Sequence, residues 1–247
     1  MTTPFIQFAD IKKSFGTNSV LKGVNLSLYR GEIIAIIGKS GTGKSVLLKH
    51  IIGLVKQDSG KILINGIPLK QLSFKDKKNF QKTLSYMFQD NALFDFMNIY
   101  DNISLPLVEN SNFSKDQIEN RVFSQMKQLG LTGIENQFPA QLSGGMKKRV
   151  ALARALVTDP EIVLFDEPTA GLDPVRKKNV HSMIQEYQEK FGFTAVIVTH
   201  DIPEIFSICQ RIAMLDEGII SFEGLKEELS DSQRKILNSF IRGDNFY

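Results

Sequence analysis

The sequence predicts an α/β protein with a parallel sheet at its centre. Three short runs, IIAII at 33–37, IVLF at 162–165 and AVIV at 195–198, are apolar at every position. Strands that are buried on both faces have this composition, and a helical pattern follows each run, as the crossovers of a parallel sheet require. The 42% hydrophobic content over 247 residues is sufficient for a sizeable core and excludes a disordered chain.

The other elements surround these strands. Further β-rich runs are expected at 5–10, 20–29, 61–64 and 84–88, and a helix-rich stretch covers about 98–157. We therefore expect one domain over 1–247, with a helical subdomain inserted at about 90–158 and short peripheral helices at about 224–247.

Two helix starts carry clear capping signals. Ser114 and Gln117 form an S-x-x-Q capping box, and Gly130 ends the helix that follows. Asp173 and Pro174 are typical of the N-cap and the first turn of another helix. The inserted segment is therefore expected to be ordered and not a linker.

Charge and cysteine content limit the partners and the cellular compartment that we expect for the protein. The 30 basic and 27 acidic residues are spread along the chain, whereas nucleic-acid binding requires concentrated basic surface, so we expect no nucleic-acid partner. The single cysteine cannot form an intrachain disulfide, which favours a reducing compartment. The first 16 residues lack the features of a secretory signal, and no run approaches the roughly 20 apolar residues of a membrane-spanning helix. Contact with a membrane is therefore expected through a partner subunit.

A phosphate-binding loop is predicted where the first buried strand meets a helix. The segment GKSGTGKS at 38–45 fits G-x-x-x-x-G-K-[ST], with a strand before it and an amphipathic helix after it. Glycines let backbone N–H groups converge on phosphate oxygens, and the helix N-terminus adds partial positive charge. Lys44 is expected at the β- and γ-phosphates and Ser45 at Mg²⁺. The predicted nucleotide-binding residues here are Gly38, Lys39, Ser40, Gly41, Thr42, Gly43, Lys44, Ser45 and Val46.

Acidic side chains follow the strand at 162–165. Asp166 is expected to hold Mg²⁺ through water, and Glu167 to orient or deprotonate the attacking water. His200 ends the strand-like run AVIVTH. Taken alone, an acidic pair is also typical of a solvated strand end. A lone histidine is also typical of a surface or capping position. The phosphate-binding loop upstream favours the catalytic interpretation for all three residues.

A second phosphate-binding feature lies in LSGGMKKRVALARAL at 142–156. Ser143 is suited to cap the helix, and Gly144 and Gly145 expose backbone N–H groups at its positive end. A serine-capped amphipathic helix with a solvated KKR face describes the segment equally well. That description leaves unexplained two glycines in a first turn, where their helix propensity is poor.

Several motifs together resemble the ABC-transporter ATPase family over nearly the whole chain. They are Gln89 in YMFQD, LSGGM at 142–146, IVLFDEP at 162–168, AGLD at 170–173 and His200. The resemblance implies a P-loop ABC ATPase core, a mixed sheet with helices on both sides, together with an N-terminal antiparallel β portion and the inserted helical subdomain. It also implies ATP hydrolysis with Mg²⁺.

The resemblance implies further roles. Gln89 is similar to the glutamine that contacts metal and nucleotide and senses their state, and Asp173 belongs to the loop that joins the nucleotide site. Phe15 is similar to the aromatic residue that stacks on adenine, although an ordinary core phenylalanine is the alternative. In this family two copies pack head to tail, so that the P-loop of one and the LSGG segment of the other close on one ATP.

Two stretches look like the ATPases of the Mla and MCE phospholipid-transport systems: FQDNALFDFMNIYDNISLPL at 88–107 and LSGGM. Asn91, Ile99 and Met146 depart from the usual letters, and Met146 replaces the glutamine general to ABC proteins. The implied role is phospholipid transport in the bacterial envelope, from the cytoplasmic face of the inner membrane, with a permease and an MCE lipid-binding protein. The run at 93–107 is expected to receive the permease's coupling helix or to pack within the subdomain.

Three other functions are alternatives to this interpretation. Another ABC importer or exporter, for amino acids, ions or lipopolysaccharide, would share all the nucleotide chemistry and differ in its permease. A soluble ABC ATPase acting on DNA or ribosomes generally carries coiled-coil, zinc or tandem-domain additions, whereas this sequence has one P-loop, one LSGG segment and no CxxC pair. DNA binding with steep salt dependence would favour that class. A module that binds ATP without hydrolysing it is disfavoured because Lys44, Asp166, Glu167 and His200 are all present.

Overall fold

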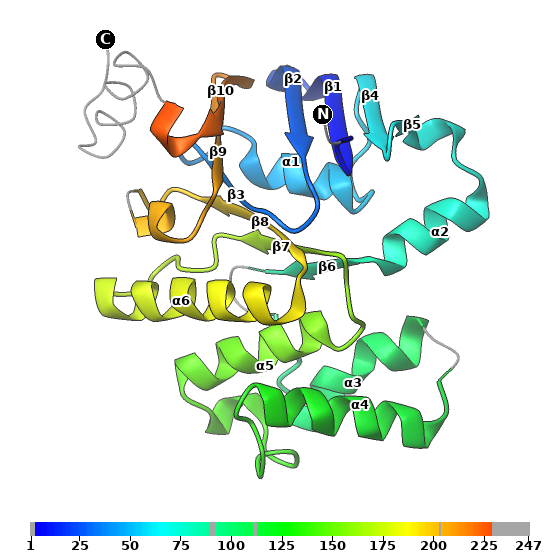
Figure 1. The fold of residues 1–247 in the computed structure, drawn as a ribbon, viewed down its shortest axis with the longest axis vertical. Helices are drawn as coiled ribbons and strands as arrows, with labels where there is room; N and C mark the ends of the chain where they lie inside the picture. Colours follow the sequence, from blue (N-terminus) through cyan, green and yellow to red (C-terminus); the bar gives the residue numbers. More distant parts are fainter. Residues whose placement is uncertain (1–2, 89–91, 111–112, 203, 229–247) are drawn as a thin grey trace.

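The computed structural model describes residues 3–88, 92–110, 113–202 and 204–228, in two sheets and the helices around them (Figure 1). The larger sheet has six strands in the order β10-β9-β3-β8-β7-β6, and all neighbouring pairs are parallel except β10 with β9. Its strands are β3 (Ile33–Ile37), β6 (Leu84–Met87), β7 (Ile162–Asp166), β8 (Thr194–Thr199), β9 (Arg211–Asp216) and β10 (Ile219–Leu225). The sheet is therefore mixed, with a parallel centre, as predicted.

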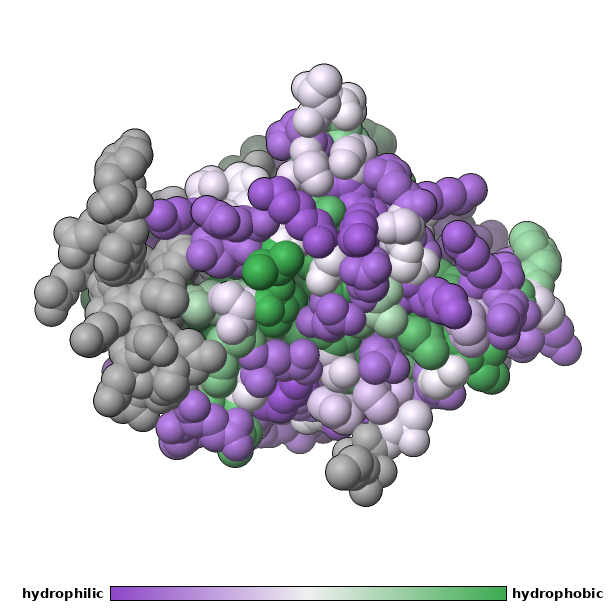
Figure 2. All heavy atoms as spheres, turned by 90° about the horizontal axis from the view of Figure 1, so that it is seen from above, coloured by the Kyte–Doolittle hydropathy of each residue, from purple (hydrophilic) through white to green (hydrophobic). Residues whose placement is uncertain are grey.

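The smaller sheet is antiparallel and is built from the first part of the chain. Its strands are β2 (Asn18–Leu28), β1 (Ile6–Phe15), β4 (Ser59–Ile64) and β5 (Ile67–Pro68), in that order across the sheet. It lies at the opposite end of the molecule from α3 and α4 (Figure 1). Viewed from the end with the antiparallel sheet, the surface is predominantly hydrophilic, with apolar side chains between the polar ones (Figure 2).

Helices cover both faces of the larger sheet. They are α1 (Lys44–Ile51), α2 (Phe74–Lys82), α3 (Ile99–Asn110), α4 (Lys115–Gln128), α5 (Gly144–Leu156) and α6 (Pro174–Phe191). Helices α3, α4 and α5 come between β6 and β7 in the chain, pack on one another, and gather at one end of the molecule (Figure 1). None of the helices in the described part of the chain combines the length and apolar character needed to cross a bilayer.

Strand β3 shows why the central runs are apolar throughout. Ile33, Ala35 and Ile37 pack in a core that includes residues of α3 to α6, whereas Ile34 and Ile36 pack in a second core with α1 and the antiparallel sheet. Because alternate side chains of a strand point to opposite faces, a strand between two cores is apolar at every position. The α/β fold with helices on both sides and an antiparallel β portion is thereby confirmed.

The capping predictions are confirmed. Ser114 accepts from the backbone N–H of Gln117, and the Gln117 side chain accepts in turn from the N–H of Ser114. Asp173 caps α6 by accepting from Arg176, with Pro174 as the first helical residue.

Two regions differ from the sequence prediction. The hairpin of β9 and β10 and the helix α2 were not predicted. The turn of that hairpin carries a recognisable signal, because Glu217 and Gly218 both have positive φ, at 44° and 84°, as two-residue hairpin loops prefer. Strand β10 extends to Leu225 and is followed by a short 3₁₀ helix, Lys226–Glu228, and the rest of the expected C-terminal helices lies outside the described residues.

Candidate nucleotide-binding site

The segment 38–45 forms a tight turn between β3 and α1. Gly43 is the N-cap of α1, with a φ of 101°, in the left-handed region that disfavours side chains. A Cβ on Gly43 would lie 2.6 Å from Cγ1 of Val20, and one on Gly38 would lie 2.3 Å from the carbonyl oxygen of Leu215. The fold therefore requires glycine at both positions. The backbone N–H groups at the start of a helix such as α1 are suited to bind phosphate.

Lys44 is buried at the first position of α1, with 4% of its surface exposed. Its Nζ donates to the carbonyl oxygens of Gly38 at 2.8 Å and Lys39 at 2.9 Å, and lies 3.6 Å from Oε1 of Glu167. Burial lowers the pKa of Lys44, and the negative charge of Glu167 opposes that shift. A cation is thus placed at the mouth of the loop, ready to contact phosphate.

Ser45 and Asp166, the two residues expected at Mg²⁺, lie in contact with each other. The Ser45 hydroxyl donates to Oδ1 of Asp166 at 2.7 Å, which joins α1 to the end of β7. No group of three or more His, Cys, Asp or Glu side chains with metal-binding geometry occurs in the described ranges. Mg²⁺ sites in nucleotide enzymes use one or two protein oxygens and complete their coordination with phosphate and water, so a hydroxyl beside a carboxylate fits the ion.

Tyr86 is a neighbour of this pair that the sequence analysis missed. Its hydroxyl donates to Oδ2 of Asp166 at 2.6 Å. Burial raises the pKa of Tyr86, and the hydrogen bond and charge of Asp166 raise it further, so the phenol stays protonated. The only sequence signal was a tyrosine at the end of a strand that is adjacent to β7.

Glu167 and His200 form the next contact, across the ends of β7 and β8. Nδ1 of His200 lies 2.9 Å from Oε2 of Glu167, and the backbone N–H of His200 donates to the same oxygen at 3.3 Å. Glu167 has a φ of 50°, which is uncommon for a residue with a long side chain, and its own N–H donates to the carbonyl of Val198 at 2.9 Å. Backbone strain of this kind gathers at functional sites.

A network behind these residues holds the loop that follows Glu167. Asp201 pairs with Lys177 of α6 and accepts from the hydroxyl of Thr169. Burial raises the pKa of Asp201, but these hydrogen bonds outweigh burial and hold it below its usual value. The buried ammonium of Lys148, on α5, donates to the carbonyl of Pro168 at 2.6 Å. Sequence analysis identified none of these contacts.

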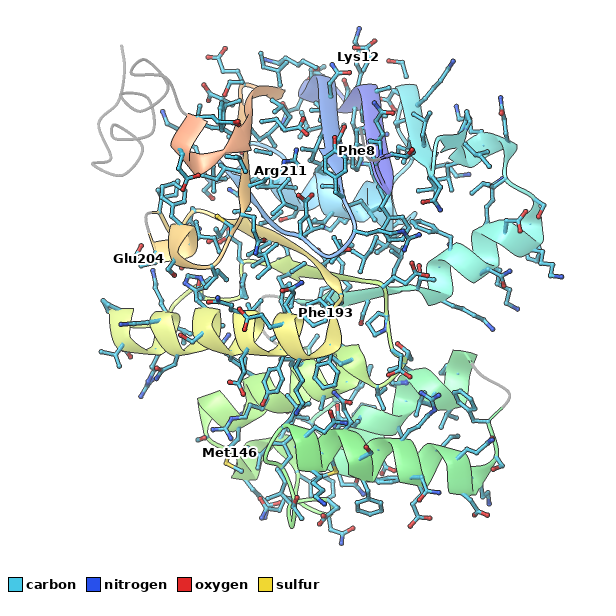
Figure 3. The ribbon with its side chains drawn as sticks, in the orientation of Figure 1. Phe8, Lys12, Met146, Phe193, Glu204 and Arg211 are labelled. Carbon is cyan, nitrogen blue, oxygen red and sulfur yellow. The ribbon has the colours of Figure 1, made fainter. Side chains whose placement is uncertain are left out.

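The LSGG segment lies apart from this site. Ser143 caps α5 by accepting from the N–H of Met146 at 3.3 Å, as predicted. Met146 lies on the far side of α6 from α1 and the antiparallel sheet (Figure 3). Within the described residues no hydrogen bond or ion pair joins Ser143 to the P-loop. A Cβ on Gly144 or Gly145 would meet no atom within 4 Å, so no neighbour in the described part of the chain requires glycine there.

The remaining predicted residues have mixed outcomes. Phe15, at the β1–β2 turn, is 49% exposed, so it is not a core residue, and Nζ of Lys13 lies 5.2 Å from its ring centroid. Gln89 lies outside the described residues, as does Asn91.

The run at 93–107 was expected either to receive a permease helix or to pack within the subdomain, and its residues differ in exposure. Ile99, Ile103 and Leu107 are buried in the core of the helical layer, whereas Phe94 and Phe96 are 40% and 76% exposed. The first three residues pack within the molecule, and the two phenylalanines remain available at the surface.

Comparison with known proteins gives several relatives. The probable ribonucleotide transport ATP-binding protein mkl of Mycobacterium leprae is 38% identical over 238 residues, which are 96% of this chain and 69% of the relative. The methionine import ATP-binding protein MetN of Clostridium acetobutylicum is 41% identical over 91% of this chain and 70% of its own length. The intermembrane phospholipid transport system ATP-binding protein MlaF of Haemophilus influenzae is 32% identical over 99% of this chain and 93% of its own.

Solved structures are similar over most of the chain. CbiO1 of Clostridium perfringens, part of the ABC transporter complex CbiONQ, has a TM-score of 0.83 and 32% identity, covering 98% of this chain and 97% of its own. The ATP-binding cassette MJ0796, a dimer in a post-hydrolysis state with ADP and Pi, has a TM-score of 0.75 and 31% identity over 89% of this chain and 98% of its own. The ABC transporter family model matches residues 21–170. The chain belongs to the ABC transporter family, as an ATPase subunit that binds ATP with Mg²⁺.

Proposed function

We propose that this ATPase powers phospholipid transport through a permease, using ATP sites that two copies of the chain share. The observation that carries the shared site concerns the loop at Lys44 and the helix start at Ser143: in the described residues no hydrogen bond or ion pair joins them, and Met146 lies on the far side of α6 from α1 (Figure 3). Both features present backbone N–H groups at helix N-termini, where anions are stabilised.

The residues around Lys44 have distinct roles in this proposal. Lys44 contacts the β- and γ-phosphates, while Ser45 and Asp166 hold Mg²⁺, which neutralises phosphate charge when bound. Glu167 orients the attacking water and takes its proton, and His200 positions Glu167 through the 2.9 Å contact. Phe15 offers an exposed π-face for adenine.

The second copy completes the site with Ser143, Gly144 and Gly145. The open space at both glycines supports this, because close approach of a ligand from outside the chain explains glycines that the fold does not need. Asp173 caps α6 and is half exposed beside the active-site loop, a position from which it reaches the partner copy. The similar cassette MJ0796 is a dimer, which supports a site that involves two copies.

A hollow beside the helical subdomain is proposed to receive the permease. It has a volume of about 650 Å³ and lies between α2, β6, α3 and the start of α4. Its wall includes Lys78, Lys82, Pro106, Leu107 and Phe113. The wall of the hollow presents both apolar and cationic groups to a partner. Phe94 and Phe96, which precede α3, are exposed apolar side chains that add further contact surface.

Phospholipid is proposed as the cargo. The supporting observations are the segments 88–107 and LSGGM and the H. influenzae relative, which is named for intermembrane phospholipid transport. On this proposal the chain is peripheral at the cytoplasmic face of the bacterial inner membrane, with an MCE lipid-binding protein in the complex. Ribonucleotide or methionine is the second candidate, because relatives named for those cargoes are 38% and 41% identical.

The test uses the whole transporter. The tagged chain is purified from native membranes, its partners are identified by mass spectrometry, and the complex is reconstituted into vesicles with a fluorescent phospholipid. We expect a permease and an MCE protein, and lipid transfer that requires ATP and is lost with Glu167→Gln. ATP-driven uptake of ribonucleotide or methionine, without lipid transfer, overturns the cargo proposal.

A further inference from the structure

We propose that Tyr86 is a positioning residue for Asp166, and that its hydroxyl sets the affinity of the site for the divalent cation. This inference rests on the proposed role of Asp166 in holding Mg²⁺. The sequence motifs assign no role to Tyr86.

The two oxygens of the Asp166 carboxylate have separate partners. The Ser45 hydroxyl donates to Oδ1 at 2.7 Å, and the Tyr86 hydroxyl donates to Oδ2 at 2.6 Å. Both distances are in the range of good O–H···O hydrogen bonds, and hydrogen bonds to an ionised acceptor are the stronger kind. Because a carboxylate held at both oxygens cannot rotate about its Cβ–Cγ bond without losing a bond, its orientation is fixed.

The two partners differ in what else they do. Ser45 is itself a proposed ligand of the cation, so its lone pairs and proton are shared between the ion and Asp166. Tyr86 contacts the carboxylate from the neighbouring strand and is not itself a proposed ligand of the cation. It is therefore the partner that orients Asp166 whether or not the ion is bound.

The phenol is held in place by its surroundings. In the register of β6 with β7, Tyr86 lies opposite Leu164, two residues before Asp166, so the long side chain spans the offset along the strands. Its ring packs against Phe88, with centroids 4.4 Å apart, and against the core beneath α1.

The expected consequence of losing the Tyr86 hydroxyl is a lower affinity for the metal, with the metal-free affinity for the nucleotide unchanged. Removing an outer hydrogen-bond partner that orients a group of a metal site lowers metal affinity, commonly by at least about tenfold. Tyr86→Phe keeps the ring and its packing and removes only the donor. We expect Mn²⁺, used as a spectroscopic substitute for Mg²⁺, to bind on the order of tenfold more weakly.

The experiment compares four forms of the full chain: wild type, Tyr86→Phe, Asp166→Asn and Tyr187→Phe. Tyr187 is a control because it packs on Phe191 of α6 and, within the described part of the chain, has no hydrogen bond to Asp166. Mn²⁺ affinity is measured by electron paramagnetic resonance with a non-hydrolysable ATP analogue. Nucleotide affinity is measured separately in EDTA, where no metal contributes.

The outcomes separate the inference from the function on which it rests. The expected result is weaker Mn²⁺ binding in Tyr86→Phe and Asp166→Asn, with wild-type affinity in Tyr187→Phe and unchanged metal-free nucleotide affinity in Tyr86→Phe. Unchanged Mn²⁺ affinity in Tyr86→Phe, while Asp166→Asn is impaired, overturns the role of Tyr86 alone. Unchanged affinity in Asp166→Asn overturns the proposed metal site. Loss of metal-free nucleotide binding in Tyr86→Phe shows a general packing role and also overturns the inference.

Discussion

The imidazole Nδ1 of His200 lies 2.9 Å from Oε2 of Glu167, and the backbone N–H of His200 donates to the same oxygen. One carboxylate oxygen is thus held by a side chain and a backbone group of a single residue. The other oxygen, Oε1, lies 3.6 Å from Nζ of Lys44. The proposed general base is therefore held between the phosphate-binding lysine and the end of β8.

The first prediction concerns the base itself. Glu167→Gln keeps the size and the hydrogen-bonding oxygen but cannot accept a proton, so we expect ATP binding to persist while turnover falls by about 10²–10⁴-fold. Without hydrolysis the shared sites stay closed, and size-exclusion chromatography with ATP is expected to show a dimer. Glu161→Gln is the control, because Glu161 is exposed and pairs with Arg30 away from the site. A Glu167→Gln protein that binds ATP and remains monomeric would falsify the shared site.

The second prediction concerns the phosphate-binding lysine. Lys44→Ala removes a buried ammonium at the mouth of the loop, and hydrogen bonds of charged groups support an expected loss of ATP affinity of at least about 10–100-fold. Lys49→Ala removes a lysine from the same helix, one that is only partly buried, and is expected to bind ATP normally. Titration with a fluorescent ATP analogue measures both variants. Equal losses in the two would mean that general basic charge, and not the position of Lys44, binds the phosphates.

The third prediction separates folding from function at the start of α5. Gly145 lies in the first turn, with open space where a side chain would lie, so Gly145→Ala is expected to raise the free energy of unfolding by up to about 1 kcal/mol. The added methyl group occupies the surface that faces the partner's nucleotide, so turnover is expected to fall at the same time. The control is Ser124→Ala, at an exposed position of α4, which is expected to leave turnover unchanged. A fully active and stabilised Gly145→Ala protein contradicts the assignment of this segment to the ATP site.

The strand-turn-helix around Lys44 and the caps of α4 and α6 were predictable because their signals are local: glycines, capping residues and apolar runs within a few positions. The contacts of Tyr86, Lys148 and Asp201 were not predictable in this way. They join residues 80, 20 and 32 positions apart, and only the packed sheet brings them together. In α3, by contrast, the four-residue spacing of Ile99, Ile103 and Leu107 is the pattern of a buried helix face, which distinguishes them from Phe94 and Phe96.

The fourth prediction concerns stability at mildly acidic pH and rests on His181 in α6. This side chain is 1% exposed, and within the described residues neither ring nitrogen has a hydrogen-bond partner. Burial lowers the pKa of His181 below 6.5, although the charges of Asp201 and Glu204 oppose the shift. As the pH falls below about 6.5, the unfolded chain therefore takes up a proton that the folded chain does not bind, and the free energy of unfolding decreases, by at most about 1.4 kcal/mol per pH unit for this histidine.

We expect the melting temperature of the wild-type protein to fall between pH 7 and pH 5, and His181→Leu, which cannot be protonated, to flatten part of that decline. The flattening is partial because His50 is also buried with a lowered pKa. His50 therefore also lowers the free energy of unfolding as the pH falls. Thermal melts of the two proteins and of His50→Leu across this range provide the measurement. If His181→Leu has the same pH slope as wild type, His181 is not the titrating group, since a leucine at this position removes its proton uptake in the folded and unfolded chains alike.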